Sequence, residues 1–427
     1  MYLEKIKNFL KKLNYRAPFF LFILLMTMTA IVPRLTSMYL TTYFYMNIVI
    51  ITILFTFITC KINHAREYLL LLLPFIVFEL LVMLSRHNDD VLLAGYQVLL
   101  FLLPVCIGFY IVTHVCFSEF YTGVLCVITL ITCITTGIGC INNPSASRTL
   151  ASTETSQDVT AILYDLQNIG GFNFVYCVVL MVPFLILALK MKKLHISVFL
   201  GIIAILIFLL IQVEYTFAIL LVMISMMTIF FKRDMGIKQF FLTILGFLVI
   251  VLVFRVAIGT FLSNFASSLG IQQVADKISA LFLGKDSVDH FDDDRGALYM
   301  KSIEMFFNHP VFGSLTGTSR KTGGHSFILD NLALYGITGG IPIVLMYAGI
   351  YKTFYHPLKD QPYYAIVFWA FLQPIVLSCL NPGMWLENLC MFAPMILCTI
   401  YGKEVYLSVV PPKPTPEIPV NVLRRKD

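Results

Sequence analysis

Charged side chains are scarce in this chain of 427 residues. Asp, Glu, Lys and Arg together make up 13% of it, against roughly 25% in typical soluble domains. Hydrophobic residues make up 59% of the chain, and its mean hydropathy is +0.85. This composition excludes an ordinary cytosolic enzyme and predicts a polytopic membrane protein.

Paired cysteine motifs are absent as well. The ten cysteines include no CxxC pair, and all of them except Cys140 lie in or beside apolar runs. Cysteine in such surroundings behaves as a small apolar side chain. We therefore expect no disulfide framework.

Long apolar runs, by contrast, are abundant. About twelve of them approach the roughly 20 residues with which an α-helix spans a bilayer. We therefore predict an all-α membrane protein with about twelve transmembrane helices, at residues 17–32, 40–60, 68–84, 97–113, 121–140, 172–189, 196–211, 216–231, 240–258, 339–351, 364–380 and 385–401.

Lys and Arg residues are concentrated at both ends of the chain and in alternate links between these runs. Links rich in Lys and Arg face the cytoplasm. This rule places both termini inside, in a multi-pass protein of the cytoplasmic membrane, and it explains the net charge of +6 without a nucleic-acid partner. The bases of the predicted cytoplasmic links are Lys61, Arg66, Lys190, Lys192, Lys193, Lys232, Arg233, Lys238, Lys352 and Lys359.

Two predicted outer segments, 141–171 and 259–338, are too long to be mere connectors. Loops of that length usually bind something or are disordered. The first could be either, whereas the second contains helical periodicity at 297–307 and again from Phe327. We therefore divide the chain into a nine-helix membrane region (1–258), a large, partly helical outer loop (259–338), a three-helix membrane region (339–402) and a cytoplasmic tail (403–427).

Residues suited to phosphate chemistry lie in the second outer loop. Arg295 opens an amphipathic helix, and His325 follows a Gly-Gly pair where the next helix is expected to start. Arginine forms fork-like contacts with phosphate oxygens, and helix N-termini also favour anions. Neutral histidine can accept a hydroxyl proton. A polyprenyl-diphosphate head group would fit these residues, although a lone loop histidine is more often solvated or structural.

The same residues resemble the core of the O-antigen ligase and polymerase superfamily. The matching stretches are Asp294-Arg295, the sequence FFNHPVFG at 306–313, His325-Ser326, and GITG at 336–339. The spacing His-Ser-x9-Gly-x-x-Gly matches the outer-loop signature of that family without a gap. The motif covers about 45 of the 427 residues.

This resemblance implies a membrane glycosyltransferase with a GT-C-like fold. Such an enzyme transfers a glycan from an undecaprenyl-diphosphate carrier to an acceptor glycan at the outer face of the membrane, and uses no metal or other cofactor. His325 corresponds to the proposed base of the family and Arg295 to its diphosphate-contacting arginine. We predict a polymerase of capsule, cell-wall polysaccharide or O-antigen that works among membrane lipids, with a flippase or a chain-length regulator as a possible partner.

The chain departs from the family pattern at one position. Family members commonly carry a second arginine in a short outer turn, where this chain has QVEYT at 212–216. Arg255, near the outer end of the ninth predicted span, is a candidate substitute, because an ionisable residue at that depth is costly unless it is paired or functional. The alternative is that Arg255 only snorkels to the interface. Glu214 could pair with it, bind an acceptor sugar, or do neither.

Three further features of the outer loop carry less weight. Arg320 could bind the carrier phosphate or an anionic lipid, or it could belong to a flexible solvated turn. The acidic run 286–294 could hold a divalent ion, but it lacks the spacing and closing Glu of an EF-hand, which favours solvation. Asp330 lies five residues after His325, and so on a different helical face, which disfavours a His–carboxylate dyad within one helix.

Two other functions remain open. An O-antigen-type ligase shares the motif and the expected chemistry with the polymerase. A transporter of polysaccharide or lipid carrier is a weaker alternative, because it would need internal repeats and mid-span polar residues. The sequence has no evident repeat of fixed period and few ionisable residues at mid-span.

Overall fold

The computed structural model describes residues 51, 65–85, 102–112, 118–143, 146, 169–213, 215–268, 272–283, 295–314, 322–402 and 404–407. Within these ranges the chain forms helices joined by turns, and no strand occurs there. The predicted all-α class is therefore confirmed. The predicted spans 17–32 and 40–60 lie outside the described ranges, apart from residue 51.

Several helices are long and apolar enough to cross a membrane. Four satisfy both criteria, and a fifth is obtained if the bent pair α14–α15 counts as one span. They fit a membrane-embedded protein. The four are Glu119–Asn142, Phe172–Lys190, Ile196–Val213 and Phe327–Leu358.

Most predicted helices in the described ranges recur within a few residues. The run predicted at 364–380 is α19, Tyr364–Leu380. The run at 172–189 is divided at Met181, just before Pro183, into two helices. The other matching elements are α5 (Ala65–Ser85), α7 (Ser118–Asn142), α10 (Phe172–Leu180), α11 (Val182–Lys190), α12 (Ile196–Val213), α13 (Thr216–Met227), η3 (Thr228–Phe230), α14 (Ile237–Val253), the π-helix η6 (Glu387–Phe392) and α20 (Ala393–Tyr401). The remaining short elements are η4 (Tyr351–Tyr355), η5 (His356–Leu358) and α21 (Glu404–Leu407).

The outer loop contributes three helices and the start of a fourth. α15 (Arg255–Ser268) follows α14 after an 81° bend and forms a hairpin with α16 (Gln272–Leu283). A 2.8 Å hydrogen bond between the hydroxyls of Ser263 and Ser279 links the two helices of the hairpin. α17 (Arg295–Asn308) follows, and then α18 (Phe327–Ile350).

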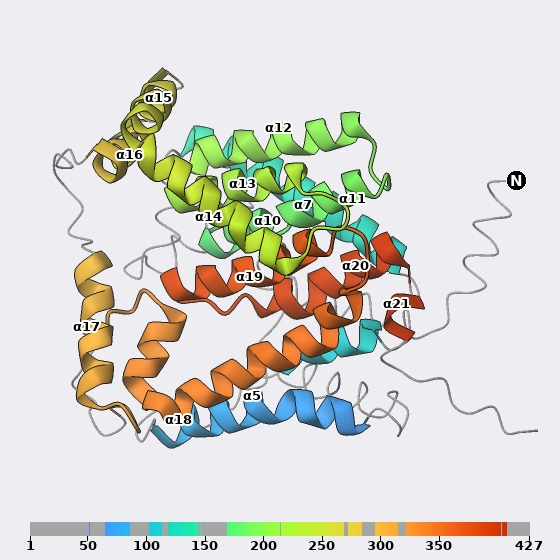
Figure 1. Ribbon diagram of the computed structural model, residues 1–427, viewed down its shortest axis with the longest axis vertical. Helices are drawn as coiled ribbons and strands as arrows, with labels where there is room; N and C mark the ends of the chain where they lie inside the picture. The colour runs from blue at the N-terminus through green and yellow to red at the C-terminus, as the bar shows by residue number, and fades with distance from the viewer. Residues whose placement is uncertain are drawn as a thin grey trace, which may run out of the picture.

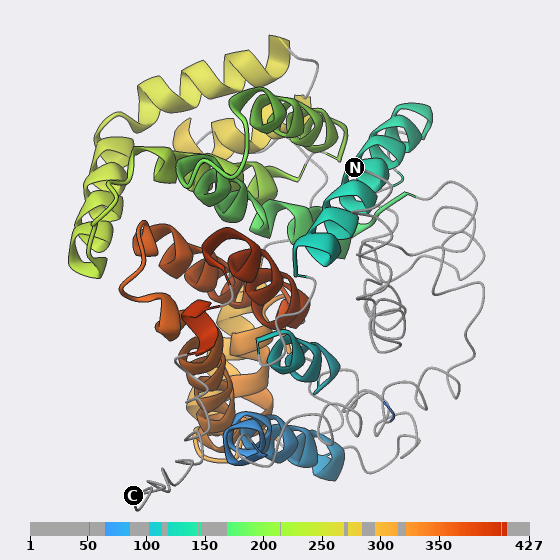
Figure 2. The same cartoon turned by 90° about the vertical axis from the view of Figure 1, so that its right-hand side faces the viewer.

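α18 begins where the sequence predicted a helix start, at Phe327, and it continues into the span predicted at 339–351. It is not straight, because Gly336 has a non-helical backbone (φ 60°, ψ −153°). The helix therefore consists of a tip, Phe327–Tyr335, and a longer segment after the break. α17 lies beside the tip at the left of Figure 1, and Figure 2 shows α5 (blue) alongside α18 (orange).

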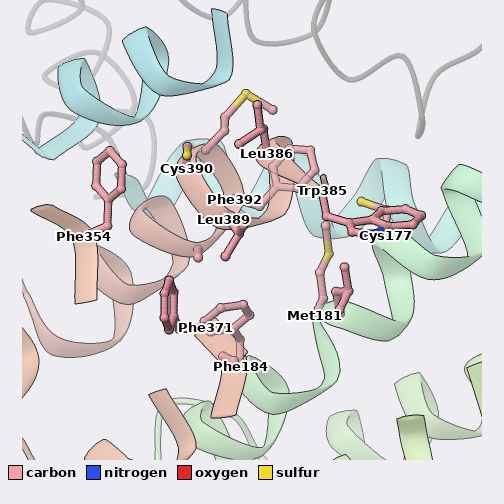
Figure 3. Packing of buried hydrophobic residues seen from close by; sticks show 14 of the residues in the cluster. Cys177, Met181, Phe184, Phe354, Phe371, Trp385, Leu386, Leu389, Cys390 and Phe392 are labelled. Carbon is pink, nitrogen blue, oxygen red and sulfur yellow. The ribbon is translucent and has the colours of Figure 1, made fainter. Parts of the chain in front are cut away.

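One large apolar core unites α10, α11, α18, α19, η6 and α20. Figure 3 shows part of it, where Cys177, Phe184 and Phe371 meet the side chains of η6. Each of the eight cysteines in the described ranges is buried or half-buried, which agrees with their prediction as small apolar side chains.

Two opposite ends of the helix assembly differ in chemistry. At one end, Lys190 donates a 3.3 Å hydrogen bond to the carbonyl of Phe231 and lies 5.5 Å from the ring of Tyr363. The N–H of Tyr363 donates to the carbonyl of Arg233 at 2.7 Å. This basic end brings together three links that the sequence predicts to be cytoplasmic. The start of α18 and the end of α19 meet at the other end.

Candidate functional site

His325 lies in the turn that leads from residue 322 into α18. Its side chain is half-buried, and Ser326, which follows it, is the N-cap of α18. The hydroxyl of Ser326 accepts a hydrogen bond from the N–H of Leu329 at 3.0 Å. Serine is among the preferred N-cap residues because its oxygen satisfies one of the free N–H groups of the first turn. The histidine is therefore fixed at the first residue outside a well-capped helix.

The carboxylate of Asp330 folds back onto this turn. It accepts a 2.9 Å hydrogen bond from the N–H of Ser326 and a 3.2 Å bond from the N–H of Gly324. It also accepts a 2.6 Å bond from the hydroxyl of Ser302 on α17. Because Asp330 lies in the first turn of α18, its charge also interacts favourably with the helix dipole.

The turn lies directly against the backbone of α17. The N–H of Gly323 donates to the hydroxyl of Ser302 at 3.0 Å. A Cβ atom at Gly323 would lie 2.2 Å from the carbonyl oxygen of Leu298, so only glycine allows this approach. Ser302 is 1% exposed, which places the contact in the interior.

The end of α19 forms the third side of the site. The N–H of Phe327 donates to the carbonyl of Asn381 at 2.9 Å. The hydroxyl of Tyr299, on α17, donates to the carbonyl of Leu380 at 2.8 Å. The start of α18, the end of α19 and the side of α17 therefore meet around the histidine turn.

The loop after α19 continues into an aromatic cluster. The ring of Trp385 lies 5.7 Å from that of Tyr176 and 6.2 Å from that of Phe172. The ring of Tyr215, the N-cap residue of α13, stacks on Tyr176 at 6.0 Å. The starts of α10, α13 and η6 thus lie at the same end of the assembly as His325.

Two buried donors of this loop have no hydrogen-bond partner among the described residues. They are Nδ2 of Asn381 and Nε1 of Trp385. The two residues as a whole are 3% and 6% exposed. Buried polar groups are nearly always paired, and each exception calls for an explanation. Both donors belong to the loop after α19, whose Asn381 carbonyl accepts the hydrogen bond from Phe327.

The upstream motif NHPVFG contacts the break in α18. The N–H of Ile337 donates to the carbonyl of Pro310 at 2.8 Å, and that of Thr338 donates to Val311 at 3.1 Å. A Cβ atom at Gly336 would lie 2.4 Å from the oxygen of Val311. The turn after α17 therefore pairs the N–H groups that the break leaves open. Two parts of the sequence motif, 306–313 and 336–339, are one structural unit.

Arg295 is the first residue of α17, and its backbone alone is described. Seven residues separate it from Ser302, which is close to two turns of 3.6 residues. Its Cα therefore lies on the face of α17 that carries Ser302, roughly 10 Å away along the helix axis at 1.5 Å per residue. Arg295 and His325 thus belong to two elements that are bonded to each other.

Arg255 lies elsewhere. It is the first residue of α15, it is exposed, and α15 contacts mainly α16 and α14. Figure 1 places α15 far from α17 and from the tip of α18. The neighbouring side chains Phe254 and Val256 are exposed and apolar, which favours an interfacial, snorkelling arginine.

Glu214, Arg320 and the acidic run 286–294 lie outside the described ranges. No group of three or more His, Cys, Asp or Glu that could hold a metal ion occurs within those ranges.

Sequence reasoning missed Ser302 and Asn381, and it considered Asp330 only as a partner for the histidine ring. A signal existed for Ser302, because it is a polar residue on the apolar face of the helix predicted at 297–307. The resulting arrangement offers a half-buried imidazole at the junction of three helices, beside donors that lack acceptors. No family model matches the chain, and no curated protein or solved structure matches it either.

Proposed function

We propose that this protein is a membrane glycan polymerase. It transfers an oligosaccharide from a polyprenyl-diphosphate carrier to an acceptor glycan at the outer face of the cytoplasmic membrane, in the synthesis of capsule, cell-wall polysaccharide or O-antigen. The supporting observation is the unit formed by the histidine turn, α17 and the break in α18. It joins the separate segments of the motif that resembles the O-antigen ligase and polymerase superfamily.

His325 is the proposed general base. It removes the proton from an acceptor hydroxyl, whose oxygen then bonds to the anomeric carbon of the donor sugar. The bond between that carbon and the diphosphate oxygen breaks, and the carrier diphosphate leaves with the electron pair. General-base catalysis of this kind contributes about 10²–10⁴-fold to a rate.

Arg295 is the proposed stabiliser of the leaving group. Charge builds up on the diphosphate as the anomeric bond breaks, and a guanidinium can contact two phosphate oxygens at once. Because Arg295 starts the helix whose Ser302 contacts the histidine turn, base and leaving-group contact belong to one bonded assembly. The diphosphate is already an activated leaving group, so no nucleotide is needed.

Acceptor binding is assigned to the loop after α19. Sugar hydroxyls are hydrogen-bond acceptors as well as donors, so they can pair with the unpaired donors of Asn381 and Trp385. Both nitrogens are buried in the structure, so acceptor binding in this proposal requires that the loop opens. The separation of a basic end, around Lys190 and Arg233, from the end that carries His325 supports an outward-facing site. About twelve transmembrane spans with both termini inside and a GT-C-like arrangement are part of this proposal.

The proposal is tested with purified protein in liposomes that contain a lipid-linked oligosaccharide prepared from the host of the protein. Polymerase activity gives a ladder of longer glycans on the carrier lipid, with release of polyprenyl diphosphate. His325→Ala should give no ladder. A ladder of unchanged intensity with that variant would remove His325 from the mechanism.

The same assay separates the alternatives. A ligase would leave carrier-linked glycans unextended and would transfer them only to an added lipid A-core acceptor. A transporter would move the lipid-linked glycan between leaflets without releasing polyprenyl diphosphate. Either result would replace the polymerase proposal.

A further inference from the structure

Asp330 accepts hydrogen bonds from the backbone on both sides of His325. The N–H of Gly324 precedes the histidine, the N–H of Ser326 follows it, and one carboxylate binds both, at 3.2 and 2.9 Å. Neither bond reaches the imidazole. The carboxylate therefore fixes where the backbone of His325 lies and leaves its ring free to meet a substrate.

Capping of α18 does not account for this arrangement. Ser326 already caps the helix through its 3.0 Å bond with Leu329. Two of the three bonds to Asp330 come from outside α18, from Gly324 and from Ser302. The carboxylate thus stabilises the turn more than the helix.

Ser302 extends the same network to α17. Its hydroxyl donates to Asp330 at 2.6 Å and accepts from the N–H of Gly323 at 3.0 Å. It is buried, and buried hydrogen bonds are shielded from competition with water. The network therefore fixes the histidine turn relative to the helix that begins with Arg295.

We propose that Asp330, assisted by Ser302, is a positioning residue that sets the distance from the imidazole of His325 to the acceptor hydroxyl. The inference rests on the proposed glycosyl transfer and deepens it. A displacement of about 1 Å in a reacting group can lower a rate about 10²-fold. Loss of the carboxylate should therefore affect turnover more than binding.

Asp330→Asn is the informative substitution. An amide offers one acceptor oxygen and one donor nitrogen, so its NH₂ group must face a donor in place of one of the two bonded oxygens. Initial rates of chain extension are measured in the liposome assay at varied donor concentration. We expect kcat to fall about 10–100-fold with KM for the donor within about twofold. Ser302→Ala should lower kcat less, because the two backbone bonds to Asp330 remain.

A double variant separates positioning from other roles. If Asp330 acts through His325, then Asp330→Asn combined with His325→Ala should release polyprenyl diphosphate at the same residual rate as His325→Ala alone, a rate about 10²–10⁴-fold below that of the unaltered protein and too low to give a visible ladder. A further fall in the double variant would overturn the proposal, as would wild-type kcat in Asp330→Asn. Glu304→Gln, which neutralises an exposed carboxylate of α17, is the matched control and should leave both constants unchanged.

Folding is monitored by the yield of each variant in membranes and by its melting temperature in detergent. If Asp330→Asn does not accumulate, Ser302→Ala and Asp330→Glu carry the test. Asp330→Glu keeps both acceptor oxygens but displaces them, so its kcat should also fall while its KM stays constant. The absence of any ladder with the unaltered protein would reject the proposed function itself, and full activity of His325→Ala would reject His325 as the base. An inactive His325→Ala beside fully active Asp330 and Ser302 variants would reject the positioning role alone.

Discussion

The N–H of Phe327 donates a 2.9 Å hydrogen bond to the carbonyl of Asn381, and this bond joins the start of α18 to the end of α19. Phe327 is the second residue after His325. The bond therefore places the histidine turn beside the loop that carries the unpaired donors of Asn381 and Trp385. The proposed base and the proposed acceptor-binding loop are therefore neighbours.

His325→Ala should abolish chain extension without lowering the amount of protein in the membrane. The imidazole is the proposed proton acceptor, and its half-buried side chain fills no core position. Glycan ladders and membrane immunoblots measure the two effects. His195→Ala is the control, because His195 is an exposed histidine at the basic end, and it should retain full activity.

Arg295→Ala and Arg295→Lys should both be severely impaired, because a point ammonium cannot replace a bidentate fork. Lys301→Ala removes an exposed charge from the same helix and should have little effect. Arg255→Ala should also retain activity, because α15 lies apart from the histidine turn. The rate of polyprenyl diphosphate release measures the activity of each variant. Strong recovery in Arg295→Lys would reduce Arg295 to a general electrostatic role, and an inactive Arg255→Ala would restore Arg255 as the second arginine.

Trp385→Phe keeps an aromatic ring and removes the unpaired indole donor. We expect KM for the acceptor glycan to rise severalfold, in line with the roughly 0.5–1.5 kcal/mol of one hydrogen bond, while kcat changes little. Acceptor saturation curves provide the measurement. Trp369→Phe is the control, because it makes the same substitution at an indole that donates to the hydroxyl of Ser225 at 3.1 Å within the core. That variant should lose stability and keep its KM, and an unchanged KM in Trp385→Phe would contradict the acceptor-binding role.

Gly336→Ala should destabilise the protein. A φ of 60° with a ψ of −153° is accessible almost only to glycine, and the new Cβ would meet the carbonyl of Val311. A residue forced into such a conformation costs about 1–3 kcal/mol, so the melting temperature in detergent should fall. Gly246→Ala, at an exposed position of α14 with open space around it, should not lower it. Equal melting temperatures for the two variants would mean that the break does not need glycine.

Labelling with a membrane-impermeant thiol reagent tests the topology. Lys301→Cys, on exposed α17, should react from outside the cell, whereas Lys192→Cys, in the exposed turn after α11, should react only after permeabilisation. The native cysteines in the described ranges are buried or half-buried, and the parent protein gives the background. Outside labelling at position 192 would overturn the predicted orientation.

Local sequence predicted the helices well where the apolar pattern alone decides them. α19 has the predicted bounds because polar and proline residues end its apolar run on both sides. The start of α18 was also predictable, since Ser326 is an N-cap residue before an apolar run. The break at Gly336 was not, because it depends on carbonyls of Pro310 and Val311, more than twenty residues away in the sequence.

The role of Asp330 was missed for a geometric reason. Helical spacing from His325 to Asp330 disfavours a direct His–carboxylate dyad within one helix, and it says nothing about contacts with the backbone of the preceding turn. His325, however, precedes the helix, and the turn folds back so that its backbone faces the carboxylate. Helical periodicity gives no information about residues that lie outside the helix.

The turn that pairs with the break in α18 also carries exposed apolar side chains, Val311 and Phe312, just after the exposed Phe307. Exposed apolar side chains that lie together on a surface mark a site of contact with a membrane or with another protein. In the proposed orientation this turn faces outward, and we expect its exposed apolar side chains to insert into the outer leaflet. The diphosphate of a polyprenyl carrier lies in the same layer, so the proposed donor would reach the histidine turn by lateral diffusion, without leaving the plane of the bilayer.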